Sequence, residues 1–171
     1  VEDDTVVIGA TTTYSDIIQS AEVEEAAPAL ADAVGAVGDT QVRNRGTIGG
    51  NVANADPDSD LPAGVLAADA TFVAEGPDGE RKMPASEFFV EKRTTSLKDN
   101  EILTHVEVPE SDAVGSYVKK TSPSSGYALV GVATQIELDD GTIESATVAA
   151  NGARDYGVRL QDVEGSLVGN V

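Results

Sequence analysis

The sequence predicts an α+β protein, because two kinds of hydrophobic pattern divide it. In residues 1–110, short apolar runs alternate with helical stripes around a glycine-rich stretch, which is typical of a mixed sheet with flanking helices. In residues 111–171, three extended runs follow one another across short turns, and a helical pattern comes last. We therefore expect a first domain over 1–110 and the start of a second over 111–171, a three-stranded antiparallel meander with a C-terminal helix.

The first elements are a strand and several helical turns. The run from Val6 to Gly9 is almost continuously apolar and predicts a buried strand. Thr13 stands three residues before Asp16 in a variant of the capping pattern, and so starts a helix at Tyr14. Pro28 interrupts the next helical stripe, so we expect that helix to restart there. The apolar positions of this stripe are Val23, Ala27, Leu30, Val34 and Val37.

The middle of the chain combines one further helix with strands. The expected elements are a helix over Leu61–Ala70 that begins near Pro62, a hairpin of Thr71–Ala74 and Glu80–Met83 around Gly76–Gly79, and a helical turn over Ser86–Val90. A half-buried strand follows over Ile102–Val108, and Pro109 ends it. Its predicted inner residues are Ile102, Val106 and Val108, which alternate with Thr104, His105 and Glu107.

A polar, glycine-containing run over Glu110–Gly115 marks the expected domain boundary. The meander strands are predicted over Ser116–Thr121, Ala128–Leu138 and Thr142–Asn151, with a hairpin turn at Asp139–Gly141. Arg154–Gly169 reads as the C-terminal helix.

Composition excludes several kinds of function. The 171 residues carry 30 acidic and 11 basic side chains, a formal charge of −19, which disfavours binding to nucleic acid or to an anionic membrane. The sequence has no cysteine and one histidine, so it offers neither iron–sulfur ligands nor a hydroxyl–His–acid set. We expect His105 to lie at a surface or strand edge. No catalytic or metal residue is predicted, and Asp56, Asp58 and Asp60 are expected in a solvated turn.

The acidic residues are interleaved with apolar ones, and only five lysines are present. This composition is typical of cytoplasmic proteins from salt-loving organisms, in which dense screening relieves the repulsion between like charges. An ordinarily acidic mesophilic protein is the alternative. No run of about 20 apolar residues suggests a membrane span, and the sequence shows no secretory leader. We expect a cytoplasmic protein.

The stretch Arg43–Asp60 predicts a ligand loop. Gly46, Gly49 and Gly50 allow positive φ and close approach to the backbone, so successive N–H groups of the turn are expected to converge on an anion. Side-chain donors and acceptors are expected from Thr47, Asn51, Asn54 and Asp60. Neither the P-loop pattern nor the dinucleotide fingerprint is present. A tight surface turn without a ligand is the alternative.

The run R-N-R-G-T-I-G-G-N-x-A-N-A-D-P-x-S-D-L-P resembles the second flavin motif in the FAD subunits of molybdenum hydroxylases. That group includes aerobic carbon monoxide dehydrogenase and xanthine dehydrogenase, and the medium subunit of the former is the nearest in pattern. Weaker similarity covers most of the chain, at Val6–Thr12, Glu101–Leu103, Ser125–Ala128 and Gly165–Gly169.

The resemblance implies an FAD-binding subunit that takes electrons from an iron–sulfur small subunit and a molybdopterin large subunit and passes them to an external acceptor. It implies that Thr47, Ile48, Gly49, Gly50 and Asn51 wrap the FAD pyrophosphate and that Asp60 binds a ribose or ribityl hydroxyl. A side chain at Gly49 or Gly50 is then expected to weaken FAD binding more than Asp60→Ala does. It also implies that Leu103 packs near the adenine or flavin and that Tyr127 covers one flavin face. Lys119 lies near a cofactor-contacting lysine of the xanthine dehydrogenase branch, and we expect it to have a structural role here.

The family also carries a first flavin motif, of the type A-G-G-x-x-L, which this sequence lacks. The resemblance thus implies that these 171 residues hold about half of a flavin site and bind FAD weakly or not at all without the rest of the subunit. Two alternatives stay open: another FAD enzyme of the same fold, and a halophilic adaptor domain that has lost its cofactor.

Overall fold

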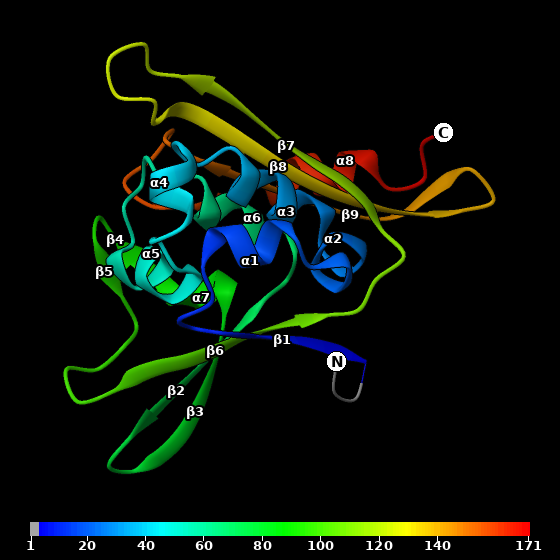
Figure 1. Ribbon diagram of the computed structural model, residues 1–171. Coiled ribbons are helices and arrows are strands. Elements are labelled where there is room, and N and C mark those ends of the chain that lie inside the picture. The colour runs from blue at the N-terminus through cyan, green and yellow to red at the C-terminus, as the bar shows by residue number, and fades with distance from the viewer. Residues whose placement is uncertain (1–3) are drawn as a thin grey trace.

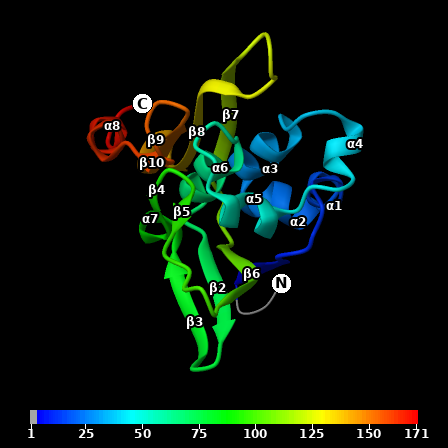
Figure 2. The same ribbon diagram turned by 90° about the vertical axis from the view of Figure 1, so that its left-hand side faces the viewer.

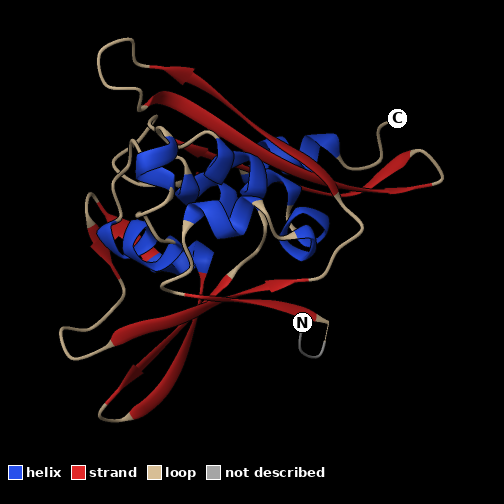
Figure 3. Ribbon diagram, viewed as in Figure 1, coloured by secondary structure: helices blue, strands red, loops and turns tan. Residues whose placement is uncertain are grey.

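Two four-stranded antiparallel sheets enclose a layer of helices in the computed structural model, which describes residues 4–171 (Figure 1). The helices lie between the sheets, with β1, β2, β3 and β6 on one side and β7, β8 and β9 on the other, as colouring by secondary structure makes plain (Figure 3). The predicted α+β class is therefore confirmed. Residues 1–3, the start of the predicted first domain, lie outside the described residues.

The first sheet has the strand order β1-β6-β2-β3 and contains Thr5–Gly9 (β1), Thr71–Gly76 (β2), Gly79–Pro84 (β3) and Ile102–Pro109 (β6). Every pairing in it is antiparallel, and the β2–β3 hairpin projects from the body (Figure 2). Val6 and Ile8 of β1 are buried, but Val7 between them is 40% exposed. The prediction that this run is buried on both faces is therefore wrong, because successive side chains of a strand point to opposite faces and only one face meets the helices.

A register shift corrects the prediction for β6. Val73 of β2 pairs with His105, but the next residue, Ala74, pairs with Leu103, so Thr104 is an extra residue of β6. Such a bulge reverses which side chains face inward beyond it. Leu103 is therefore buried, whereas Ile102, which the alternation placed inside, is 74% exposed.

The helices between the sheets are α1 (Tyr14–Ile18), α2 (Ala21–Ala26), α3 (Pro28–Gly35), α4 (Thr40–Arg43), α5 (Ile48–Asn54) and α6 (Leu61–Ala67). The Thr13 hydroxyl accepts a hydrogen bond from the Asp16 N–H, which confirms the predicted cap. The predicted restart at Pro28 is confirmed as well, because α2 ends at Ala26 and Pro28 is the first residue of α3. A proline tolerates this position because its missing N–H would have no partner there.

The second sheet confirms the predicted meander of β7 (Val114–Thr121), β8 (Ala128–Asp139) and β9 (Thr142–Asn151). The predicted helix over Arg154–Gly169 is wrong in its first half. A fourth strand, β10 (Val158–Arg159), pairs there with β9, and α8 spans only Gln161–Leu167. Arg159 holds this arrangement by pairing with Glu164 of α8 and with Asp69 after α6.

The segment between β3 and β6 contains α7 (Ala85–Phe88), β4 (Phe89–Glu91) and β5 (Thr94–Thr95). The predicted turn over Ser86–Val90 is therefore helical only in its first part. Phe88 and Phe89 pack on Phe72 of β2, and the Phe72 and Phe88 ring centroids lie 4.0 Å apart. These are all three phenylalanines of the chain, and they form one aromatic cluster.

One hydrophobic core runs through all three layers, from Val106 in the first sheet through Leu30 of α3 to Ala133 in the second. The residues after β6, up to β7, connect the two sheets at the predicted boundary. Helices α3 and α6 pack against the second sheet as well as against each other. The glycine-rich stretch around α5 is thus held between both sheets.

Candidate functional site

The glycine-rich stretch forms a short helix rather than a loop. Helix α5 begins directly after Thr47, whose side chain accepts a hydrogen bond from the Gly50 N–H at 3.1 Å. It ends at Asn54 and is capped by Ala55, which has the left-handed backbone conformation. The prediction of a loop is wrong here because Thr47 is a good N-cap, and this cap together with contacts to neighbouring segments outweighs the low helix propensity of two glycines.

None of Gly46, Gly49 and Gly50 adopts positive φ, and the first two serve close packing instead. A Cβ on Gly46 would collide with the ring of Tyr14, and one on Gly49 would lie 2.6 Å from both Cβ and O of Ala10. At Gly50 a Cβ would meet only the Thr47 hydroxyl, at 3.0 Å. Gly50 is exposed, so it presents bare backbone to solvent.

The N–H groups at the start of α5 do not converge on an open anion site. The Ile48 N–H donates to the Thr12 carbonyl at 3.1 Å, and the Gly49 N–H donates to the Ala10 carbonyl at 2.9 Å. The N–H groups of Gly50 and Asn51 both donate to Thr47. The predicted nest of backbone donors is therefore filled from within the chain. The backbone at Gly50 is exposed, and no acceptor for the Thr47 hydroxyl proton is found among residues 4–171.

The side chain of Asn51 is held at both ends. Its amide nitrogen donates to the Tyr14 hydroxyl at 2.8 Å, and its amide oxygen accepts from the Ser59 hydroxyl at 2.9 Å. Burial raises the pKa of Tyr14, so this hydroxyl stays neutral at physiological pH. Sequence reasoning placed Asn51 at the site but treated Tyr14 as a helix residue only.

Asp60 is buried and engaged through both carboxylate oxygens. One oxygen accepts from the Tyr117 hydroxyl at 2.6 Å, and the other accepts from the Lys119 ammonium at 2.8 Å. Lys119 also donates to the carbonyls of Ala36 and Gly126, at 2.9 and 3.2 Å. Its three donors are thus committed to three segments of the chain, which agrees with the structural role expected from the sequence.

Burial, followed by the bond to the Asp60 carboxylate, raises the pKa of Tyr117 far above the ordinary range. The Tyr117 oxygen also lies 3.1 Å from the side-chain oxygen of buried Asn151. The amide nitrogen of Asn151 has no hydrogen-bond partner among the described residues. Exchanging oxygen and nitrogen in that amide would let it donate to Tyr117. Tyr117 could have been recognised from its spacing of two residues from Lys119, because residues 117 and 119 of one strand point to the same face.

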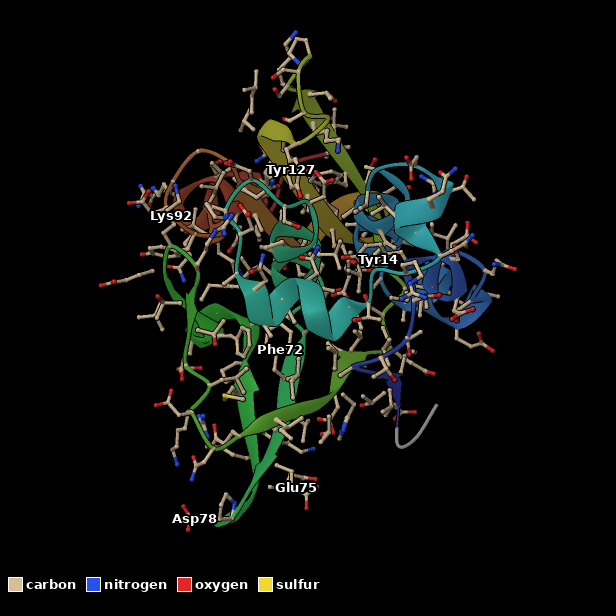
Figure 4. All side chains as sticks on the ribbon, turned by 60° about the vertical axis from the view of Figure 1, so that its left-hand side comes forward. Tyr14, Phe72, Glu75, Asp78, Lys92 and Tyr127 are labelled. Carbon is tan, nitrogen blue, oxygen red and sulfur yellow. The ribbon has the colours of Figure 1, made fainter. Side chains whose placement is uncertain are left out.

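The two remaining predicted site residues differ in exposure. Leu103 is buried on β6 as part of the core. Tyr127 is 53% exposed and ends the loop between β7 and β8, which Lys119 ties to the body through Gly126. Figure 4 shows Tyr127 at the base of this hairpin, above α5, with Tyr14 beside the helix.

The segment that follows α5 joins three other loops through its backbone. The carbonyls of Ala55, Pro57 and Asp58 accept hydrogen bonds from the N–H groups of Arg93, Gly152 and Ala128 respectively. The side chain of Asp56 pairs with Arg93 at 2.6 Å. Asp56 and Asp60 are therefore not the solvated acids that the sequence predicted. No group of three acidic or histidine side chains suited to a metal ion occurs in residues 4–171.

Comparison with known proteins decides the family. The family described as the FAD binding domain in molybdopterin dehydrogenase matches residues 1–111. The chain belongs to this family. The glyceraldehyde dehydrogenase medium chain of Sulfolobus acidocaldarius is 39% identical over 163 residues, which cover 95% of this chain and 58% of that protein. The carbon monoxide dehydrogenase medium chain of Hydrogenophaga pseudoflava is 36% identical over 170 residues, which cover 98% of this chain and 59% of that protein.

Solved structures agree with this flavin-domain assignment. Carbon monoxide dehydrogenase from Hydrogenophaga pseudoflava, in a form that lacks the Mo-pyranopterin moiety, matches with a TM-score of 0.94 and 37% identity over 100% of this chain and 60% of that chain. Quinoline 2-oxidoreductase from Pseudomonas putida matches with a TM-score of 0.91 and 26% identity over the same shares. The resemblance to FAD subunits is confirmed, and the chain spans about three fifths of the length of these relatives.

The residues around α5 fit part of an FAD molecule. Gly50 carries no side chain and is exposed, so a phosphate can approach its backbone, and Thr47 has a hydroxyl proton to donate. Tyr127 offers a half-exposed aromatic ring for stacking. Asp60 and Lys119 form an ion pair within the chain, and the side chain of Asp60 is buried. No helix in residues 4–171 is long and apolar enough to cross a membrane.

Proposed function

We propose that this chain is the part of a molybdenum hydroxylase FAD subunit that holds the pyrophosphate of the flavin cofactor, with residues 1–110 as the second FAD-binding subdomain and residues 111–171 as the start of the next domain. Family membership supports this, and the observation that carries it is the exposed, side-chain-free backbone at Gly50 beside the Thr47 hydroxyl. When bound, FAD supplies the redox chemistry, while protein groups position it.

In this proposal the residues of the chain have separate roles. Thr47 donates its hydroxyl proton to a phosphate oxygen, and Gly50 lets that phosphate lie against the helix. Ile48 and Gly49 pack inward and fix the turn. Asn51 braces it, and Tyr127 covers one face of the flavin. Leu103 forms the apolar surface on the β6 side of the site. Asp60 positions Lys119 and Tyr117 instead of binding ribose.

The partners follow from the names of the relatives. Medium chains such as that of carbon monoxide dehydrogenase are by name one chain of a larger enzyme. We place this chain in a cytoplasmic complex with an iron–sulfur small subunit and a molybdopterin large subunit. FAD held by this chain would pass electrons from these subunits to an external acceptor. The 171 residues contain no cysteine and so supply no thiolate ligand for an iron–sulfur cluster.

The test replaces Gly50 by valine. The side chain projects into solvent past Thr47, so the fold is retained, but it covers the backbone that the phosphate would approach. We expect the dissociation constant for FAD to rise at least about tenfold, which corresponds to about 1.4 kcal/mol. The measurement is a calorimetric titration of the 171-residue chain, and of a longer polypeptide that contains it, with FAD.

Gly165→Val is the matched control, because Gly165 is an exposed glycine in another seven-residue helix and a Cβ there meets nothing within 4 Å. FAD binding that is equally tight in both variants would show that α5 does not contact the phosphate. A polypeptide that binds no FAD at all would favour the cofactor-free adaptor.

We also propose that the protein is adapted to high salt. Thirty acidic residues and a formal charge of −19 repel one another most at low ionic strength, where the Debye length is about 30 Å at 0.01 M. We expect the melting temperature to rise between low and molar potassium chloride. Equal or lower stability in molar salt would contradict the proposal.

A further inference from the structure

Tyr14 contacts Gly46 and Asn51, which stand on either side of the turn Thr47–Gly50 at the start of α5. Its backbone N–H donates to the Gly46 carbonyl at 3.0 Å, and its ring occupies the space that a side chain on Gly46 would need. Its hydroxyl accepts the amide hydrogen of Asn51 at 2.8 Å. These three contacts come from one buried residue at the start of α1, and they reach residues 46 and 51 on either side of Thr47 and Gly50.

Helix α5 depends on such contacts for its shape. It has only seven residues, two of which are glycines, and a helix this short is unstable on its own. Asn51 is held by Tyr14 on one side and by Ser59 on the other, so the orientation of α5 is restrained by one distant side chain and by one from the segment that follows the helix. Loss of the Tyr14 hydroxyl leaves the Asn51 amide nitrogen without its partner and releases one of these two restraints.

We propose that Tyr14 is a positioning residue of the flavin site, which acts through Asn51 to fix the backbone of Thr47–Asn51 in the geometry that receives the phosphate. This inference rests on the proposed function of that turn. Tyr14 contacts the turn directly, so its effect is on cofactor affinity and on the rigidity of α5.

The test is Tyr14→Phe, which removes one oxygen and keeps the ring against Gly46. We expect the dissociation constant for FAD to rise about fivefold, as for the loss of one hydrogen bond. We also expect faster amide hydrogen exchange at Gly50 and Asn51 in the ligand-free chain, because both N–H groups depend on the turn being held to Thr47. Tyr156→Phe is the matched control: Tyr156 is partly buried against the same core, and no hydrogen bond of its hydroxyl is found among the described residues.

The two readouts separate the inference from the proposed function. Faster exchange at Gly50 and Asn51 in Tyr14→Phe, with Tyr156→Phe like the parent chain, supports the positioning role whether or not FAD binds. Unchanged exchange overturns it. So does FAD affinity equal to that of Tyr156→Phe in a chain that binds FAD. A parent polypeptide that binds no FAD overturns the proposed function alone, and exchange then still decides the role of Tyr14 in holding the turn.

Discussion

Asp60→Ala is expected to lower the free energy of unfolding by about 3–5 kcal/mol, the cost of removing one partner from a buried ion pair. The substitution leaves the Lys119 ammonium, whose side chain is 11% exposed, without its counter-charge. It also removes the acceptor of the Tyr117 hydroxyl. Because the tether from Lys119 to Gly126 depends on the same ammonium group, the loop that carries Tyr127 should loosen as well. Urea unfolding followed by circular dichroism measures the change.

Asp58→Ala provides the comparison, since Asp58 is an exposed acid two residues away and no side-chain hydrogen bond of its carboxylate is found among residues 4–171. Its stability should lie within about 0.5 kcal/mol of the parent chain. Similar values for the two variants would show that the Asp60 pair is not a stabilising contact. The sequence pattern alone assigned Asp60 only one bond to a ribose hydroxyl, and so did not predict this loss of stability.

Gly49→Ala is expected to destabilise the fold by about 1–3 kcal/mol, the usual cost of overpacking. The new methyl group would lie 2.6 Å from the Ala10 carbonyl oxygen, which is backbone and cannot move aside without disturbing its bond to the Gly49 N–H. The strain therefore passes into the connection between β1 and α1. Chemical unfolding of the purified chain measures this change in the free energy of unfolding.

Gly50→Ala is the internal comparison, because the neighbouring glycine is exposed and a Cβ there meets only the Thr47 hydroxyl at 3.0 Å. Alanine is the better helix former by about 0.5–1 kcal/mol, so this variant should be about as stable as the parent chain. Equal losses of stability at the two positions would mean that the packing of Gly49 on Ala10 is not specific. Adjacent glycines in one motif thus have different purposes: one is needed by the fold, and the other by the proposed ligand.

Local chemistry determined much of the chain. The Thr13 cap, the break at Pro28 and the Asp139–Gly141 turn each act within a few residues, so their outcome does not depend on distant partners. The three meander strands followed from alternation and turn spacing for the same reason. The long motif from Arg43 to Pro62 also carried the family, because its glycines and polar residues stand in an order that few other folds require.

Contacts between distant segments decided the rest. The β6 bulge turns Leu103 inward and Ile102 outward, and it is set by pairing with β2 and not by the β6 sequence. The partners of Asp60 lie 57 and 59 residues away, so the sequence could mark the acid as polar and near a ligand motif but could not show that Tyr117 and Lys119 satisfy it. The N–H groups of α5 are likewise filled by carbonyls of residues 10 and 12. A buried polar group must find a partner, and which partner it finds depends on how the chain packs.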